Sequence, residues 1–122
     1  MSDLEAFRKY REKMNDRILS AGNLSIKRFF ALDGRAYEKG ALDVKTKELL
    51  GLVASTVLRC DDCITYHVIR CVQVGVNEEE LLETLNVAMI VGGSITIPHV
   101  RRAVGTFDEC RQRQQQGEEL KL

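Results

Sequence analysis

Proline occurs only once in this chain, at Pro98, and that scarcity constrains the fold more than any other feature of the sequence. Proline breaks helix interiors, so a chain of 122 residues with one proline can form long uninterrupted helices. Alternation of β-branched and polar residues, which is typical of strands, is scarce. Apolar residues recur instead at spacings of three and four. We therefore predict an all-α fold, a compact bundle of about six helices.

The spacing of apolar residues and the helix-stop signals give the expected bounds of the first three helices. A helix over residues 3–20 is stopped by the segment 21–23. A second helix ends at Gly40, and a third, capped by Asp43, runs from about residue 44 to residue 58. The expected apolar anchors are Leu24, Phe29, Phe30, Leu32 and Tyr37 in the second helix, and Leu49, Leu50, Val53, Ala54, Val57 and Leu58 in the third.

Two further helices follow in the middle of the chain. The fourth begins at Cys60 and ends at Gly75, and Asn77 caps the fifth, with Glu80 as its partner in a capping box. The fifth helix is apolar on nearly every face and ends at the glycine pair 92–93. Such a helix must be buried on several sides. In so small a protein this pattern indicates a subunit interface as well as a core.

The last helix is expected to begin at or just after Pro98, and the polar region 112–116 to fray into a tail. No linker is long enough to divide the chain. A length of 122 residues fits one domain and allows a real core without disulfides as staples. We therefore predict a single domain over residues 1–122.

Charge and composition exclude several classes of protein. Lysine plus arginine equal aspartate plus glutamate at 18 each, which gives no electrostatic case for nucleic acid or an anionic membrane as partner. No apolar run approaches the roughly 20 residues of a membrane helix, and the first residues lack the pattern of a signal peptide. We expect a cytoplasmic protein. Its four cysteines then indicate catalysis, metal binding or simple burial.

Two of these cysteines, Cys60 and Cys63, are three residues apart, and His67 follows four residues later. On a helix, residues at these spacings share one face. The helix N-terminus stabilises a thiolate, and a nearby imidazole can take the thiol proton. Side chains three apart on a helix have Cβ atoms about 5–6 Å apart, whereas a disulfide needs about 3.5–4.5 Å. Oxidation therefore requires local adjustment, which favours a labile disulfide suited to turnover.

Other residues near this motif have less specific interpretations. Asp61 and Asp62 complement the helix start but oppose thiolate formation, and we interpret them as solvated capping acids. Glu48, taken from the residues alone, is an ordinary surface acid. Cys71 could line the face of His67 but is more typical of a small core residue. The role of His99 stays open: the residue is exposed, has a structural role or points into a pocket. We interpret Cys110 as a thiol without a function near the C-terminal helix.

A metal site is the first alternative to redox chemistry. Cys60, Cys63 and His67 could form a zinc site together with Cys71 or His99. Such ligands would crowd on one helix, whereas structural zinc sites mostly draw their ligands from two separated pairs. The second alternative is an oligomeric interaction protein whose cysteines sense redox state without turnover.

The combined motif resembles that of the alkylhydroperoxidase D (AhpD)-like proteins of the carboxymuconolactone decarboxylase superfamily. Glu48, an eleven-residue gap, and Cys60-x-x-Cys63-x-x-x-His67 carry the resemblance. The segments 49–55, 75–80 and 88–93 support it. The similarity covers about residues 25–107, with the N-terminal helix and the polar C-terminal tail flanking this core.

The resemblance implies an all-α homotrimer or homohexamer with thiol peroxidase or disulfide reductase activity and no cofactor. Cys63 would attack the peroxide, Cys60 would resolve the product, and Glu48 with His67 would form the proton relay. An external dithiol protein would be the reductant. Asp62 stands where the best-characterised peroxidases of the family carry a histidine, so a more general redox role is also compatible. The decarboxylases of the superfamily do not rely on this cysteine pair, which argues against their activity here.

Overall fold

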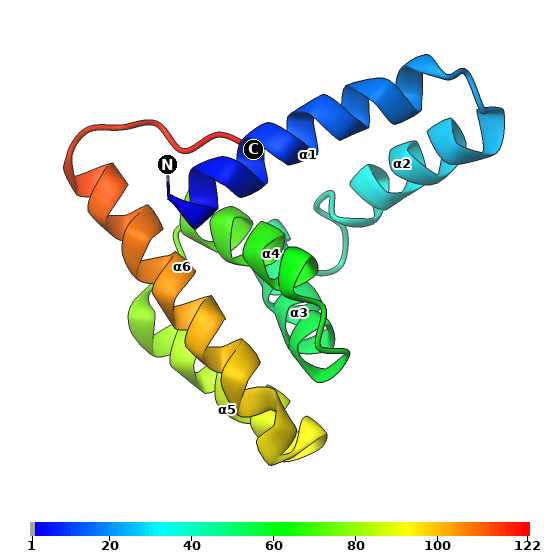
Figure 1. Cartoon of the computed structure of the whole chain (residues 1–122). Helices are drawn as coiled ribbons and strands as arrows, with labels where there is room; N and C mark the ends of the chain where they lie inside the picture. The colour runs from blue at the N-terminus through cyan, green and yellow to red at the C-terminus, as the bar shows by residue number, and fades with distance from the viewer. Residues whose placement is uncertain (1) are drawn as a thin grey trace. The chain divides into compact units, whose positions relative to one another are not determined.

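The computed structural model describes residues 2–122, and no strand occurs among them. This confirms the all-α prediction (Figure 1). The elements are α1 (Asp3–Ser20), α2 (Leu24–Ala36), α3 (Val44–Val57), α4 (Asp61–Gln73), α5 (Glu78–Gly92), the 3-10 turn η1 (Ser94–Thr96) and α6 (Ile97–Gln115). Within the described residues, none of these helices is both long and apolar enough to cross a membrane.

Side-chain caps define several of the helix starts. The Asn23 side chain accepts a hydrogen bond from the Ile26 N–H at 3.0 Å and begins α2. At α5 the predicted capping box is present: the Asn77 side chain accepts from the Glu80 N–H, and the Glu80 carboxylate accepts from the Asn77 N–H, both at 2.9 Å. These bonds satisfy N–H groups that have no partner within the helix.

The chain forms two compact units, Met1–Asp43 with α1 and α2, and Val44–Leu122 with the remaining helices. In the first unit α2 ends at Ala36, earlier than the expected stop at Gly40. The expected anchors of α2 are not buried; Phe29 and Leu32, for example, have 69% and 64% of their surface exposed. A helix can be amphipathic without its apolar face meeting the core of its own unit. The prediction of one domain over residues 1–122 stays a prediction.

The core of the second unit lies between four helices. Helix α3 packs against α4 and α5, and α4 packs against α6. The largest side chains with almost no exposed surface are Leu52, Ile64, Ile69, Leu81 and Leu85. Burying a leucine or isoleucine side chain contributes about 1.5–3 kcal/mol, so these few residues supply much of the stability of this unit.

The face of α3 that meets the core differs from the predicted apolar stripe. Its buried residues are Glu48, Gly51, Leu52, Ser55 and Thr56. Of the predicted stripe, Leu50 and Leu58 are exposed by 54% and 76%. Apart from Leu52, the core contact of α3 is thus made by small and polar residues, which hydrophobic spacing does not detect. The apolar stripe lies largely outside the core of the described chain.

Helix α5 likewise has more apolar surface than the core covers. Leu81, Leu85 and Ala88 are buried, whereas Val87, Ile90 and Val91 are exposed by 54%, 87% and 67%. The end of the helix comes close to α3: a Cβ added to Gly92 would lie 2.6 Å from Thr96 Cγ2 and 3.6 Å from Val57 Cα. The glycine stop that the sequence indicates is therefore also a packing requirement.

The C-terminal region is more ordered than predicted. Helix α6 continues to Gln115, and Gly117 ends it with φ +82°. The backbone carbonyl of Leu120 accepts a hydrogen bond from Gln73 Nε2 at 3.0 Å, and the Leu120 side chain is buried. The prediction of a frayed region 112–116 is wrong because polar side chains there form specific bonds; Arg113, for example, pairs with Glu118 at 3.0 Å.

Candidate functional site

The turn between α3 and α4 presents the cysteine pair. The Cys60 N–H bonds to the Ser55 carbonyl at 3.0 Å, and the Arg59 N–H bonds to the Thr56 carbonyl at 3.1 Å. This pair of bonds is the Schellman motif that ends many helices. The motif requires a left-handed backbone conformation at the residue after the helix, and this residue is usually glycine. Here the residue is Arg59, with φ +59°, and among residues 2–122 no other non-glycine residue has a positive φ. Strained backbone of this kind clusters at functional sites.

Cys60 and Cys63 form a disulfide. Cys60 is the N-cap of α4 with extended backbone angles, φ −99° and ψ 100°, and its Cα lies 5.3 Å from that of Cys63. The local adjustment that a helical pair would require is therefore provided by Cys60 lying just outside the helix. The Cys63 N–H points at Cys60 Sγ at 3.3 Å. Cys63 is exposed and Cys60 half-buried, so an external molecule can reach the pair through Cys63.

Behind this pair, α3 and α4 form a buried acid–base cluster. Glu48 Oε1 lies 2.9 Å from His67 Nδ1, and Glu48 Oε2 accepts from Arg70 Nε at 3.2 Å. The Glu48 side chain is 1% exposed, and that of His67 is 10% exposed. A buried carboxylate is costly unless it is paired and hydrogen-bonded, and here both oxygens have partners. The interpretation of Glu48 as a surface acid is wrong.

The bond to Glu48 also orients the imidazole of His67. With Nδ1 donating to the carboxylate, Nε2 is the nitrogen that can accept a proton. His67 is four residues after Cys63 on the same helix, which places both on one face of α4. The arrangement has the parts of a thiol-activating base: an orienting carboxylate, an imidazole and a thiol one turn away.

Arg70 belongs to this cluster but not to the sequence motif. A signal for it exists, because Arg70 follows His67 by three and so shares its helix face. A signal for Glu48 exists too: Leu52 and Ser55 follow it at spacings of four and seven, and all three are buried. The signal for Glu48 becomes visible only once the buried face of α3 is known.

A second carboxylate–histidine pair lies at the first residue of α4. Asp61 Oδ1 is 2.7 Å from His99 Nδ1, and Asp61 Oδ2 is 3.3 Å from Arg102 Nε. His99 and Arg102 both come from the first half of α6. The Asp61 side chain is 40% exposed and lies in the first turn of α4, as expected of a solvated acid at a helix start, but it is also paired with two residues of α6. His99 thus has a defined partner. Asp62 is exposed, as expected.

The other two cysteines lie in the core, as predicted for Cys71. Both Cys71 and Cys110 are fully buried, and neither forms a disulfide in the described chain. Burial, followed by the negative charge of Glu48, raises the pKa of Cys71 to about 12, although Arg70 acts in the opposite direction. Within residues 2–122, no three histidine, cysteine, aspartate or glutamate side chains are placed to hold a metal ion together. The zinc set that spacing suggested is not assembled in this disulfide form.

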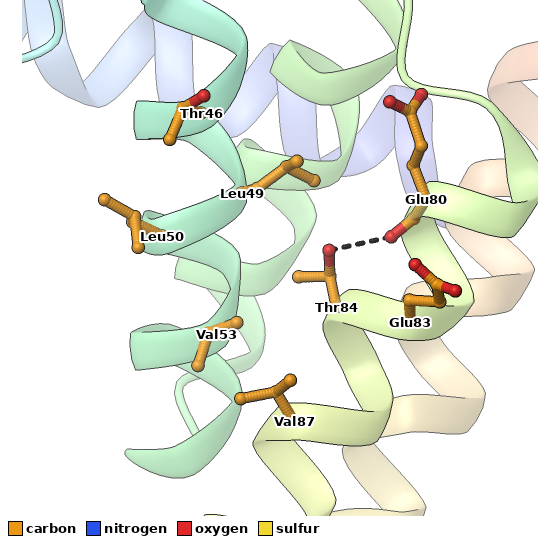
Figure 2. A pocket seen from close by; sticks show the side chains of 8 residues that line it. All are labelled: Thr46, Leu49, Leu50, Val53, Glu80, Glu83, Thr84 and Val87. Carbon is orange, nitrogen blue, oxygen red and sulfur yellow. Dashed lines mark hydrogen bonds between the residues drawn. The ribbon is translucent and has the colours of Figure 1, made fainter. Parts of the chain in front are cut away.

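A separate groove of about 450 Å³ runs between α3 and α5 (Figure 2). Val53 and Val87 point toward one another across it, and its floor contains neither cysteine nor histidine. The lining residues are Thr46, Leu49, Leu50, Val53, Glu80, Glu83, Thr84 and Val87. The groove thus exposes part of the apolar stripe of α3 and offers no chemistry of its own.

The geometry can be compared with that of known proteins. The model of the carboxymuconolactone decarboxylase family matches residues 23–105, which include both cysteines of the pair, Glu48 and His67. The chain belongs to this family. The superfamily that the motif indicates is therefore confirmed.

Solved structures of carboxymuconolactone decarboxylase family members share this fold. One is a protein from Thermotoga maritima for which a role in an antioxidative response has been suggested; it is 56% identical, with a TM-score of 0.91 over 96% of this chain and 99% of that chain. Another, from Legionella pneumophila, is 28% identical, with a TM-score of 0.84 over 90% of this chain and 98% of that chain. A curated relative, uncharacterized protein 4 in the cox locus of Paracoccus denitrificans, is 31% identical over 66% of this chain and 73% of its own length.

Proposed function

We propose that this family member is a thiol-disulfide oxidoreductase of the alkylhydroperoxidase type, which reduces a peroxide or a disulfide. The observation that carries the proposal is the Cys60–Cys63 disulfide at the start of α4, in which Cys63 is exposed, together with the buried Glu48–His67 pair that joins α3 and α4. The antioxidative role suggested for the Thermotoga maritima relative supports it. We also propose that residues 1–122 act as one domain, in the cytoplasm.

The reaction begins with the reduced pair. His67, oriented by Glu48, takes the proton of the Cys63 thiol, and the thiolate attacks the outer oxygen of a peroxide. The O–O bond breaks, Cys63 becomes a sulfenic acid, and the leaving alkoxide takes a proton to form an alcohol. Exposure of Cys63 favours it for this step.

The second half of the cycle uses Cys60. Its sulfur attacks the sulfenic acid sulfur, water leaves, and the Cys60–Cys63 disulfide forms. Thiol–disulfide exchange with an external dithiol protein then reduces this disulfide and oxidises the partner. The helix N-terminus stabilises the thiolate released at Cys60, because the Cys63 N–H points at that sulfur.

A turnover assay tests the proposal. Reduced protein is mixed with an alkyl hydroperoxide and a dithiol reductant, and consumption of both is followed, with Cys63→Ser as the inactive reference. Stoichiometric oxidation without turnover by any dithiol would favour the redox-sensing alternative. Bound zinc at one equivalent in the reduced protein would favour the metal-binding alternative.

We further propose that the protein is a homo-oligomer, a trimer or a hexamer. The exposed apolar residues Val87, Ile90 and Val91 of α5 and the groove between α3 and α5 support this assembly. Single exposed apolar residues are ordinary, but a contiguous run on adjoining helices marks an interaction surface.

A further inference from the structure

Two carboxylates in the second unit are held in the same way. Glu48 is bound by a histidine and by an arginine three residues later on α4, and Asp61 by a histidine and by an arginine three residues later on α6. In each cluster one carboxylate oxygen faces the imidazole Nδ1 and the other faces the guanidinium Nε. The Glu48 cluster belongs to the proposed proton relay. The Asp61 cluster has no role in that mechanism.

The Asp61 cluster lies at the cysteine pair. Asp61 is the first residue of α4 and directly follows Cys60, the N-cap. Its backbone carbonyl accepts from Thr65 Oγ1 at 3.0 Å, while its side chain is held by His99 and Arg102. The cluster therefore joins the start of α6 to the first turn of α4, where the thiolates form.

The charges around Cys60 show why such a cluster is needed. Arg59 precedes it, Asp61 and Asp62 follow it on α4, and α6 contributes His99 and Arg102, while the Glu48 cluster adds its own charges behind the pair. A carboxylate beside a thiol disfavours the thiolate. An arginine paired with that carboxylate compensates its charge, and a histidine that donates to it keeps its oxygen turned toward α6.

We propose that His99 and Arg102 are positioning residues for the cysteine pair and act through Asp61. By holding and compensating the Asp61 carboxylate, they keep the start of α4 favourable for a thiolate and so set the reduction potential of the Cys60–Cys63 couple. A more stable thiolate stabilises the reduced form, which makes the disulfide more oxidising. The proposal rests on the cysteine pair of the proposed function being a redox couple.

The test measures the reduction potential against a glutathione or dithiothreitol buffer, and the thiol pKa from the ultraviolet absorbance of the thiolate. Arg102→Gln and His99→Ala should raise the thiol pKa and make the disulfide less oxidising. Because the Arg102 side chain is 66% exposed, the expected change is about two- to fivefold in the exchange equilibrium, or about 10–20 mV. Asp61→Asn should act in the opposite direction. His99→Gln, which can still donate to Asp61, should recover part of the loss.

The double variant Asp61→Asn/His99→Ala provides the decisive comparison. If His99 acts through Asp61, adding His99→Ala to Asp61→Asn should change neither the reduction potential nor the thiol pKa any further. Arg101→Gln is the matched control, since it removes the same charge from the neighbouring exposed position of α6.

Two results would overturn the proposal. The first is that Arg102→Gln and His99→Ala lower the melting temperature but move the potential and the thiol pKa no further than Arg101→Gln. The second is an equal shift from His99→Ala with and without Asp61. A failure of the proposed function looks different, because it appears as absent peroxide turnover in the wild type, whereas the potential and the pKa are measured without peroxide.

Discussion

Glu48 Oε1 lies 2.9 Å from Nδ1 of His67, a residue 19 positions further along the chain, and both side chains are almost completely buried. This bond joins α3 to α4 at a residue one helical turn after Cys63. If it forms the proton relay, then Glu48→Gln or His67→Ala should slow peroxide attack near neutral pH by about 10²–10⁴-fold, the usual value of general-base help.

A pH series separates this relay from a structural role. Part of the lost rate should return as pH rises, because hydroxide then generates the thiolate without the imidazole. Alkylation rate is measured against pH for the wild type and both variants, with the exposed Glu83→Gln as control. Superimposable profiles, together with lower melting temperatures, would mean that Glu48 and His67 stabilise the fold only.

Peroxide should convert the reduced protein to the form with the intrachain Cys60–Cys63 disulfide. Serine variants should show that the two cysteines have separate roles in this reaction. Cys63→Ser should not react, whereas Cys60→Ser should stop at a sulfenic acid that a dimedone-type probe labels. Peptide mapping by mass spectrometry locates both products. Labelling of Cys60 in the Cys63→Ser variant would reverse the roles, and a dominant linkage to Cys110 would contradict the pair.

Cys71 should be inert in the folded protein. With its pKa raised to about 12, it carries almost no thiolate at neutral pH and is also buried. An alkylating reagent should therefore label reduced Cys60 and Cys63 and reach Cys71 only after unfolding. Rapid labelling of Cys71 without denaturant would contradict this.

The same shift predicts an alkaline loss of stability. An unfolded thiol ionises with a pKa of about 8.5, below that of Cys71 in the fold. Above about pH 8.5 the unfolded state therefore binds fewer protons than the folded state. The contribution of the Cys71 thiol to the free energy of unfolding is fully present below about pH 8.5 and is lost as pH rises toward 12. Denaturant titrations at pH 8 and pH 10 should show that the free energy of unfolding falls less between these two pH values for Cys71→Ala than for the wild type.

Arg59 should be a site where stability and reactivity oppose each other. Its left-handed backbone, φ +59°, suits glycine, so Arg59→Gly should stabilise the fold by up to about 1 kcal/mol. Loss of the cation beside Cys60 should at the same time raise the thiol pKa. Arg59→Lys is the control that keeps the charge and the strain. An Arg59→Gly variant that is less stable than the wild type would contradict this reading of the turn.

The exposed face of α5 should mediate assembly. Light scattering at micromolar concentration should give a mass of a trimer or hexamer of the 13.8 kDa chain. Ile90→Asp, at a position 87% exposed, should dissociate it without unfolding the chain, because the charge would be buried only in the assembly. Exposed Glu79→Gln is the control on the same helix. A clean 13.8 kDa wild-type monomer would rule out the assembly.

Local patterns in the sequence were sufficient for much of the molecule. Helix starts such as the Asn77–Glu80 capping box, and the position of Cys60 at the start of α4, depend on residues three or four apart. Interactions over such short separations are determined by backbone geometry, which a spacing rule describes. The family resemblance added Glu48 as a candidate, which its surroundings in the sequence did not.

Only the tertiary structure decided which faces of the helices are buried and which charges are paired. Hydrophobic spacing predicts that the apolar stripe of α3 and the anchors of α2 face the core, yet the core face of α3 carries Glu48, Gly51 and Ser55. Asp61 meets His99 across 38 positions and Glu48 meets His67 across 19, so neither pair has a local signature. A buried ion pair such as Glu48–His67 depends on packing between helices, because the cost of desolvating its charges is offset only where the helices bring the partners into good hydrogen-bond geometry. Hydrophobic spacing, in contrast, shows that a face avoids water without showing whether its own core or another chain covers it.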